Sequence, residues 1–227
     1  MPERTIKDAW KKAWASPVTR WHLIITIMII PAFMLVLPLF FNYIEKRNGV
    51  VLNDWLLAQI APHNVSIVIF SVIWGMMLLV LYRSLRAPSI LITYCFTLAF
   101  VTVARVTCIS LVPLLPPVGF IPLTDPLSGA FYGEANITHD LFFSGHTATL
   151  MTIFLCLQKK TDKIIGLLAI IAIAILLVIQ HIHYTIDILA APVIVYFIYR
   201  LTNRYFFKKK GKRKLFRRRV RSKAYSA

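Results

Sequence analysis

The sequence predicts an all-α, polytopic membrane protein with six transmembrane helices. Of its 227 residues, 58% are hydrophobic and only 15% are charged, and the mean hydropathy is +0.70. This balance differs from that of ordinary globular domains in the direction of membrane proteins. Six apolar stretches are each close to the ~20 residues that cross a hydrocarbon core as a helix. They lack the alternation of barrel strands, so helices are the structure that satisfies their backbone polar groups.

We expect the six spans at residues 22–43, 65–82, 89–115, 141–158, 163–180 and 184–201. They divide the chain into a cytoplasmic amphipathic lead (1–21), a six-helix membrane domain (22–201) and a basic cytoplasmic tail (202–227). The lead places Trp10, Ala13 and Trp14 at helical spacing among lysines, which is typical of a helix on a membrane surface. From Pro113 to Asn136, at the end of the third span and after it, five prolines and three glycines predict an irregular outer loop.

Basic residues predict the orientation. Counted between the expected spans, 23 of the 26 Lys and Arg fall on the side of both termini, whereas Lys46 and Arg47 fall on the other side. By the positive-inside rule, both termini of this integral membrane protein are cytoplasmic. Thirteen of the basic residues lie between positions 200 and 223. A tail of this kind predicts binding to anionic lipids of the membrane surface, not to nucleic acid.

Two histidine-bearing clusters, "DLFFSGHT" and "HIHYTID", then fall at the extracytoplasmic ends of two spans. If the sixth helix begins near Ile182, His183 and Asp187 share one face, and the carboxylate can hold one nitrogen of the imidazole. The other ring nitrogen is then free and electron-rich. A histidine oriented in this way suits a nucleophile or a general base.

The first cluster favours an anion such as phosphate. Ser144 and Gly145 lie near the outer start of the fourth helix, where backbone N–H groups and the helix dipole attract anions. The missing side chain of Gly145 lets an oxyanion approach the backbone closely. With an anion held there, His146 can protonate a leaving oxygen.

Arg105 lies toward the outer end of the third span. An unpaired cation there costs ~2.5 to 3.5 kcal/mol, so we expect an anionic partner. Phosphate, Asp187 and Asp140 are the candidates. His181 and His183 form an H-x-H pair that is able to supply two zinc ligands, but no Cys or Glu joins them, and we expect no metal.

The residues taken together resemble a known group. "FSGHT" followed by "HYTID", Asp140 six residues before His146, and a third span that runs as "ARVTCISLVPLLPP" into the proline-rich loop are similar to the sphingomyelin synthase branch of the lipid phosphate phosphatase and phosphotransferase superfamily, the type 2 phosphatidic acid phosphatase (PAP2) fold. The resemblance covers about residues 53–201. It implies six helices, an extracytoplasmic or lumenal site and no metal or other cofactor. It also implies that His183 attacks phosphorus, Asp187 orients it and His146 shuttles the proton.

The resemblance further implies the reaction. Phosphocholine or phosphoethanolamine would pass from a phospholipid to ceramide or a similar lipid alcohol, with diacylglycerol as the leaving group. The phosphatase branch carries P-S-G-H and S-R-x5-H, whereas this chain has Phe143 before Ser144, and Leu176 and Leu177 before His183, which argues against an ordinary phosphatidate phosphatase. Tyr184 lies near enough to offer a choline headgroup an aromatic face. A lipid phosphatase or phospholipase C-like hydrolase is the nearest alternative, and a non-enzymatic membrane scaffold is the alternative of another class.

Overall fold

The computed structural model describes residues 5–123 and 137–207, and within these ranges the regular elements are helices. In chain order they are α1 (Ile6–Ala15), α2 (Pro17–Ile44), the 3-10 turn η1 (Leu57–Gln59), α3 (Ser66–Arg86), α4 (Pro88–Leu111), α6 (Gly145–Cys156), α7 (Lys160–Ile179), α8 (Thr185–Thr202) and the π-helical turn η2 (Asn203–Phe207). The predicted all-α class is confirmed. Most of the basic tail, from residue 208, and residues 124–136 of the proline-rich loop lie outside the described residues.

In the described part of the chain, five helices are long and apolar enough to cross a membrane: α2, α3, α4, α7 and α8 with its π-helical extension. They identify an integral membrane protein. The fourth expected span, residues 141–158, contains only the 12-residue helix α6. At 1.5 Å per residue this helix is about 18 Å long, shorter than the ~30 Å hydrocarbon core. α6 contacts α3, α4, α7 and α8, so neighbouring helices rather than lipid surround it.

Two helices begin at a proline, Pro17 in α2 and Pro88 in α4. Proline suits this position because the first N–H groups of a helix make no hydrogen bond within the helix, so the N–H that proline lacks is not needed. α2 therefore starts inside the expected lead, five residues before the predicted span. It is the least buried of the long helices, and large apolar side chains such as Leu35 and Leu39 are exposed along it. In a membrane protein such a surface faces lipid.

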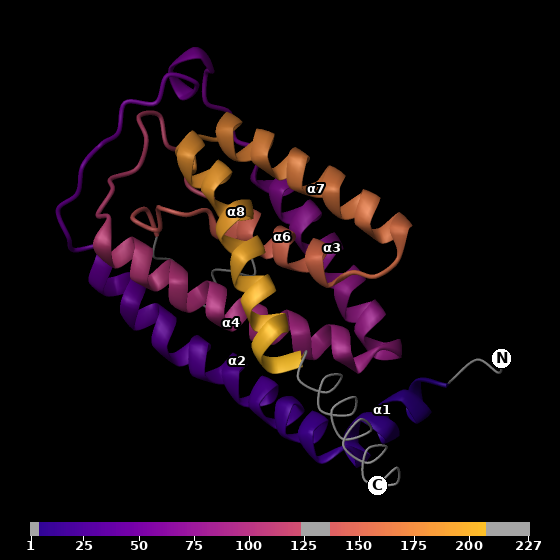
Figure 1. Ribbon diagram of the computed structural model, residues 1–227. Helices are drawn as coiled ribbons and strands as arrows, with labels where there is room; N and C mark the ends of the chain where they lie inside the picture. Colours follow the sequence, from indigo (N-terminus) through magenta and orange to yellow (C-terminus); the bar gives the residue numbers. More distant parts are fainter. Residues whose placement is uncertain (1–4, 124–136, 208–227) are drawn as a thin grey trace, which may run out of the picture.

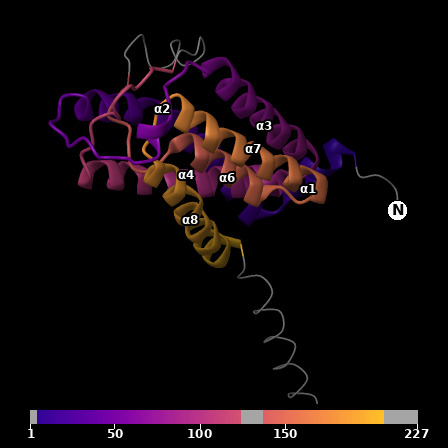
Figure 2. The same cartoon turned by 90° about the horizontal axis from the view of Figure 1, so that it is seen from above.

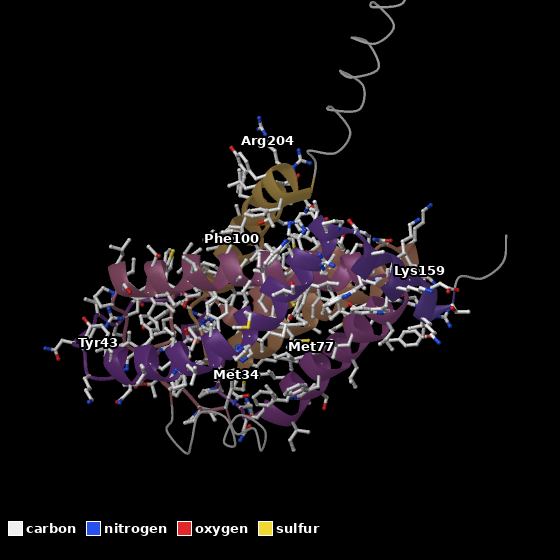
Figure 3. All side chains as sticks on the ribbon, turned by 90° about the horizontal axis from the view of Figure 1, so that it is seen from below. Met34, Tyr43, Met77, Phe100, Lys159 and Arg204 are labelled. Atoms are coloured by element: carbon white, nitrogen blue, oxygen red, sulfur yellow. The ribbon has the colours of Figure 1, made fainter. Side chains whose placement is uncertain are left out.

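The connections lie at two ends of the bundle. The α2–α3, α4–α6 and α7–α8 connections share one end, which we call the histidine end, and the short α3–α4 and α6–α7 connections share the other (Figure 1). Tyr43, near the end of α2, and Lys159, between α6 and α7, accordingly lie at opposite ends of the molecule in Figure 3. α1 packs at the end opposite the histidine end. There, Trp10 Nε1 donates to the carbonyl oxygen of Leu85 at 2.8 Å.

α6 is the centre of the packing (Figure 1). One of its faces joins the core of α3, α4 and α7 through Leu150 and Ile153, which are fully buried. Its other face meets α8, where Ala148 and Ala191 allow close approach of the backbones. Figure 2 shows that α8 then diverges from the other helices toward its C-terminal end. The start of α6 is thereby fixed against the start of α8.

Candidate active site

The structure brings the two histidine clusters together at the histidine end. The ring centroids of His146 and His183 are 6.1 Å apart, with 61° between the ring planes. His183 Nδ1 lies 3.5 Å from Asp187 Oδ2, and both side chains are almost fully buried. The helix α8 begins at Thr185, within one residue of the expected span at 184–201, so the condition that it begins near Ile182 and carries both residues on one face is not met. His183 therefore belongs to the α7–α8 connection and approaches Asp187 from outside the helix.

Asp187 joins the two segments. Its Oδ2 accepts a hydrogen bond from the backbone N–H of Tyr184 at 3.2 Å, which closes the first turn of α8. Its backbone carbonyl accepts the N–H of Ser144 at 3.2 Å, at the start of α6. One residue thus contacts the segment of each histidine.

Three buried polar atoms of this cluster have no hydrogen-bond partner among the described residues: His146 Nδ1, His183 Nδ1 and Asp187 Oδ1. Such atoms are rare in folded proteins because each costs desolvation free energy, and they concentrate at functional sites. The 3.5 Å separation of His183 and Asp187 exceeds a normal hydrogen bond. A shortening of roughly half an ångström would make one, and catalytic hydrogen bonds are often long before substrate binds.

Asp140 is the anionic partner of Arg105. Arg105 Nη2 donates to Asp140 Oδ1 at 2.6 Å, and Nε donates to the carbonyl oxygen of Phe143 at 3.1 Å. Burial alone would raise the pKa of Asp140, but the charge and hydrogen bond of Arg105 hold this pKa below its ordinary value. Arg105 Nη1 has no acceptor among the residues described.

Gly145 makes room for the guanidinium group. A Cβ atom at Gly145 would lie 2.7 Å from Arg105 Cζ and Nη1, far inside van der Waals contact. Arg105 therefore lies against the first turn of α6. The backbone N–H groups of Gly145 and His146 have no acceptor in residues 5–123 and 137–207. A helix N-terminus with free N–H groups beside a guanidinium favours phosphate.

Ser144 has a different place from the one expected. It is fully buried, its Oγ accepts from the N–H of Thr147 at 3.4 Å, and its own N–H donates to Asp187. Ser144 therefore caps α6 and does not offer its N–H to an anion.

Tyr184 and His181 join the α7–α8 segment to the α2–α3 and α4–α6 connections through hydrogen bonds. The Tyr184 hydroxyl donates to the carbonyl oxygen of Leu115 at 2.9 Å and accepts from the N–H of Leu52 at 3.0 Å. The two ring nitrogens of His181 lie 2.8 and 2.9 Å from the carbonyl oxygens of Val118 and Ile60, so His181 does not join the other histidines.

The sequence reasoning missed two carboxylates of the α2–α3 connection, Glu45 and Asp54. Glu45 binds residues 138 and 139, and Asp54 binds Thr185, directly beside the two clusters. A signal was present, because the chain has only nine Asp and Glu and two of them fall in this one loop.

The fold and the cluster define an all-α integral membrane protein with two histidines, two carboxylates and an arginine at one end. Residues 139–204 match the family model described as PAP2 superfamily C-terminal. The matched region contains α6, α7, α8 and both histidine segments, and it supports the PAP2 superfamily for this part of the chain. It supports with equal weight the phosphatase and phosphotransferase types of lipid enzyme within that superfamily. No curated protein matches the chain.

Proposed function

We propose that the protein is a lipid headgroup phosphotransferase. It moves phosphocholine or phosphoethanolamine from a glycerophospholipid to ceramide or a similar lipid alcohol through a phosphohistidine. The observation that carries this proposal is the pair of histidine rings, 6.1 Å apart and from separate segments, beside the Arg105 guanidinium. Two imidazoles at this separation are able to serve the attacking and leaving sides of one phosphorus atom.

In the first half of the reaction, His183 Nε2 attacks phosphorus. The phosphorus–oxygen bond to diacylglycerol breaks, its electron pair stays on oxygen, and His146 supplies the proton to that oxygen. The Asp187 carboxylate lies 3.5 Å from His183 Nδ1 and would accept a hydrogen bond from Nδ1–H on closer approach, which keeps that proton on Nδ1 and leaves Nε2 as the nucleophilic nitrogen. Arg105 and the free N–H groups of α6 stabilise the charge on the phosphoryl oxygens.

In the second half, the hydroxyl oxygen of the acceptor lipid attacks the phosphorus of the phosphohistidine. His146 takes the hydroxyl proton, and the bond between phosphorus and His183 breaks. A hydrolase would use water in place of the acceptor.

The membrane placement is part of the proposal. With both termini cytoplasmic, the histidine end faces the extracytoplasmic or lumenal side, and donor and acceptor lipids enter from that leaflet. The chain then consists of a cytoplasmic lead, a membrane domain and a cytoplasmic tail, and the first helix of the membrane domain begins at Pro17 rather than at residue 22. The tail binds anionic lipids on the cytoplasmic leaflet.

The test measures headgroup transfer by purified protein in lipid vesicles that contain labelled phosphatidylcholine or phosphatidylethanolamine and ceramide. His183→Ala should abolish transfer and acid-labile labelling of the protein. His146→Ala should lower the rate by about 10²- to 10⁴-fold. His63→Ala is the matched control, because His63 is exposed at the same end and its ring faces only the carbonyl oxygen of Ala61.

Undiminished transfer by the His183→Ala protein would refute the proposal. Release of soluble phosphoalcohol from vesicles without ceramide, dependent on His183, would assign the protein to the hydrolases.

A further inference from the structure

Glu45 binds the segment that precedes the first histidine cluster. It follows the last residue of α2, and its Oε1 accepts the backbone N–H groups of Thr138 and His139 at 2.6 and 2.7 Å. Its Oε2 lies 2.8 Å from Thr138 Oγ1 and 2.9 Å from His139 Nδ1. Burial would raise the pKa of Glu45, but these hydrogen bonds lower it, so the group is a carboxylate at neutral pH.

The segment that Glu45 binds, residues 138 and 139, is followed directly by Asp140, the partner of Arg105. Arg105 in turn contacts the carbonyl oxygen of Phe143 and the Cα side of Gly145. A displacement of residues 138–139 is therefore transmitted through a 2.6 Å ion pair to the guanidinium and to the start of α6, where His146 lies.

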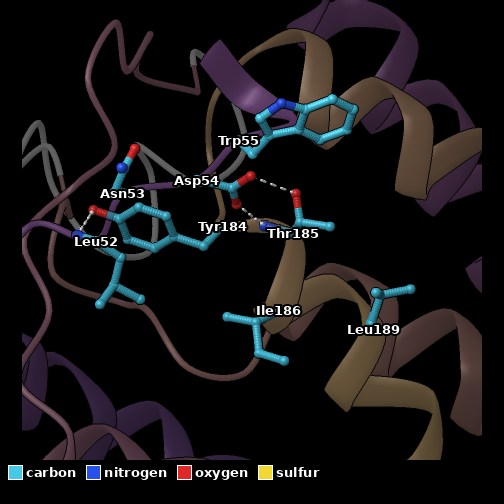
Figure 4. A pocket seen from close by; sticks show the side chains of 8 residues that line it. All are labelled: Leu52, Asn53, Asp54, Trp55, Tyr184, Thr185, Ile186 and Leu189. Carbon is cyan, nitrogen blue, oxygen red and sulfur yellow. Dashed lines mark hydrogen bonds between the residues drawn. The ribbon is translucent and has the colours of Figure 1, made fainter. Parts of the chain in front are cut away.

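Asp54 binds the second cluster in the same way. Its Oδ2 accepts the N–H of Thr185 at 2.6 Å, and its Oδ1 accepts the Thr185 hydroxyl at 2.9 Å (Figure 4). Oδ1 also accepts the N–H groups of Leu56 and Leu57 at 3.1 and 3.3 Å, which fixes the loop that carries it. Thr185 is the first residue of α8 and lies two positions after His183.

Both carboxylates belong to one loop with an anchor of its own. Between them, the N–H of Val50 donates to the carbonyl oxygen of Pro113, and the N–H of Leu115 donates back to Val50. The loop is thus held to the α4–α6 connection independently of the two clusters. Glu45 and Asp54 both lie outside the matched region, residues 139–204.

We propose that Glu45 and Asp54 are positioning residues for the reaction. Each carboxylate accepts hydrogen bonds from backbone N–H groups of one histidine-bearing segment and holds that segment in place. The loop that carries both carboxylates thereby sets the separation of the His146 and His183 rings. This inference rests on the proposed function. It assigns the α2–α3 loop a role in catalysis without contact to substrate. It also gives the two carboxylates different effects, because Glu45 acts through the anion-binding residues and Asp54 acts through the nucleophile.

The test compares Glu45→Gln and Asp54→Asn in purified protein. An amide nitrogen cannot accept from an N–H group, so each change breaks part of its cluster while the side-chain volume stays the same. Asp162→Asn is the matched control, because Asp162 is a buried carboxylate paired with Arg83 at the other end of the bundle. Four quantities are measured for each protein: the Tm, the kcat and the KM of headgroup transfer, and the affinity for inorganic phosphate from its effect on the Tm.

Both loop variants should lose kcat by about 10- to 100-fold, because a misplacement of 1 Å costs about 10²-fold in rate. Glu45→Gln should also weaken phosphate binding, whereas Asp54→Asn should leave phosphate affinity and KM unchanged. Asp162→Asn should lower the Tm alone. Thr138→Ala and Thr185→Ala each remove a single hydroxyl contact, so they provide the same comparison with smaller losses if a carboxylate variant fails to fold.

Loop variants that behave like Asp162→Asn, with a lower Tm but unchanged kcat and phosphate affinity, would overturn the inference. If the wild-type protein has no His183-dependent transfer, the proposed function fails. Phosphate affinity then still decides the role of Glu45, and equal affinity in Glu45→Gln and wild type would reject it.

Discussion

The close packing of the Arg105 guanidinium against Gly145 predicts the effect of a larger residue at position 145. A Cβ atom at position 145 would lie 2.7 Å from Arg105 Cζ, and ordinary contacts of this kind begin at 3.4 Å. Gly145→Ala must therefore displace the guanidinium by about 0.7 Å, the difference between these two distances. The displacement disturbs the 2.6 Å contact with Asp140 and the 3.1 Å contact with the carbonyl oxygen of Phe143.

We expect His183-dependent headgroup transfer by Gly145→Ala to fall by about 10- to 100-fold, since a 1 Å error in placement costs about 10²-fold. Affinity for inorganic phosphate should fall as well, because Arg105 and the first turn of α6 form the proposed anion site. Fold stability should change little, because alanine is favoured over glycine in a helix by up to about 1 kcal/mol and offsets the strain.

Gly75→Ala is the matched control. Gly75 lies inside α3, and a Cβ atom there meets nothing within 4 Å. This variant should gain about 0.5 to 1 kcal/mol of stability and keep wild-type transfer. If Gly145→Ala retains wild-type transfer and phosphate affinity, the position of the guanidinium is not required, and the assignment of Arg105 to phosphate binding is refuted.

Three further predictions concern stability. Burial alone would raise the pKa values of Glu45 and Asp54, but hydrogen bonds hold both below their ordinary values of 4.5 and 3.8. The stability that these carboxylates contribute is complete above those ordinary values and is lost as pH falls through the lower folded values, so the Tm should fall below about pH 4.5, and less steeply in a Glu45→Gln, Asp54→Asn double variant. Asp162→Asn should lower the Tm by several degrees and leave turnover of the folded protein unchanged, because it removes the bidentate partner of Arg83. His181 has a φ of 54° and contacts two carbonyl oxygens, so His181→Ala should cost about 2 kcal/mol in thermal unfolding and His181→Asn less, because asparagine adopts positive φ more readily.

Composition and spacing were sufficient to predict the class and the common depth of the clusters. Apolar stretches near 20 residues predict spanning helices, and the basic residues between them predict that both histidine motifs lie at one end. The approach of His183 to Asp187 was also expected, and the structure places their side-chain atoms 3.5 Å apart, although His183 lies before α8 and not on its face. These features depend on local sequence and on counting, so no tertiary contact is needed to find them.

The two helix starts beside the site differ in how far they could be predicted. Hydropathy counts residues 141–144 as part of a span, but Arg105 binds the Phe143 carbonyl and Ser144 caps the helix, so α6 begins only at Gly145. The start of α8 was expected at residue 184 and lies at Thr185, where the local capping box of Tyr184 and Asp187 closes the first turn. Asp54, 131 residues earlier, also binds the N–H and hydroxyl of Thr185, and this contact between distant segments has no local pattern in the sequence.

The charges of the site bear on how it would bind the phosphodiester headgroup of the proposed substrate. Arg105 carries one positive charge, but Asp140 neutralises it at 2.6 Å, and Asp187 adds a negative charge beside His183. With neutral histidines these three groups carry a net negative charge, which disfavours an anionic headgroup in a buried site. In the proposed mechanism, protonation of His146 would cancel that charge and would place the proton next to the leaving oxygen. Recognition of the anion and general-acid catalysis would then both depend on one proton on His146.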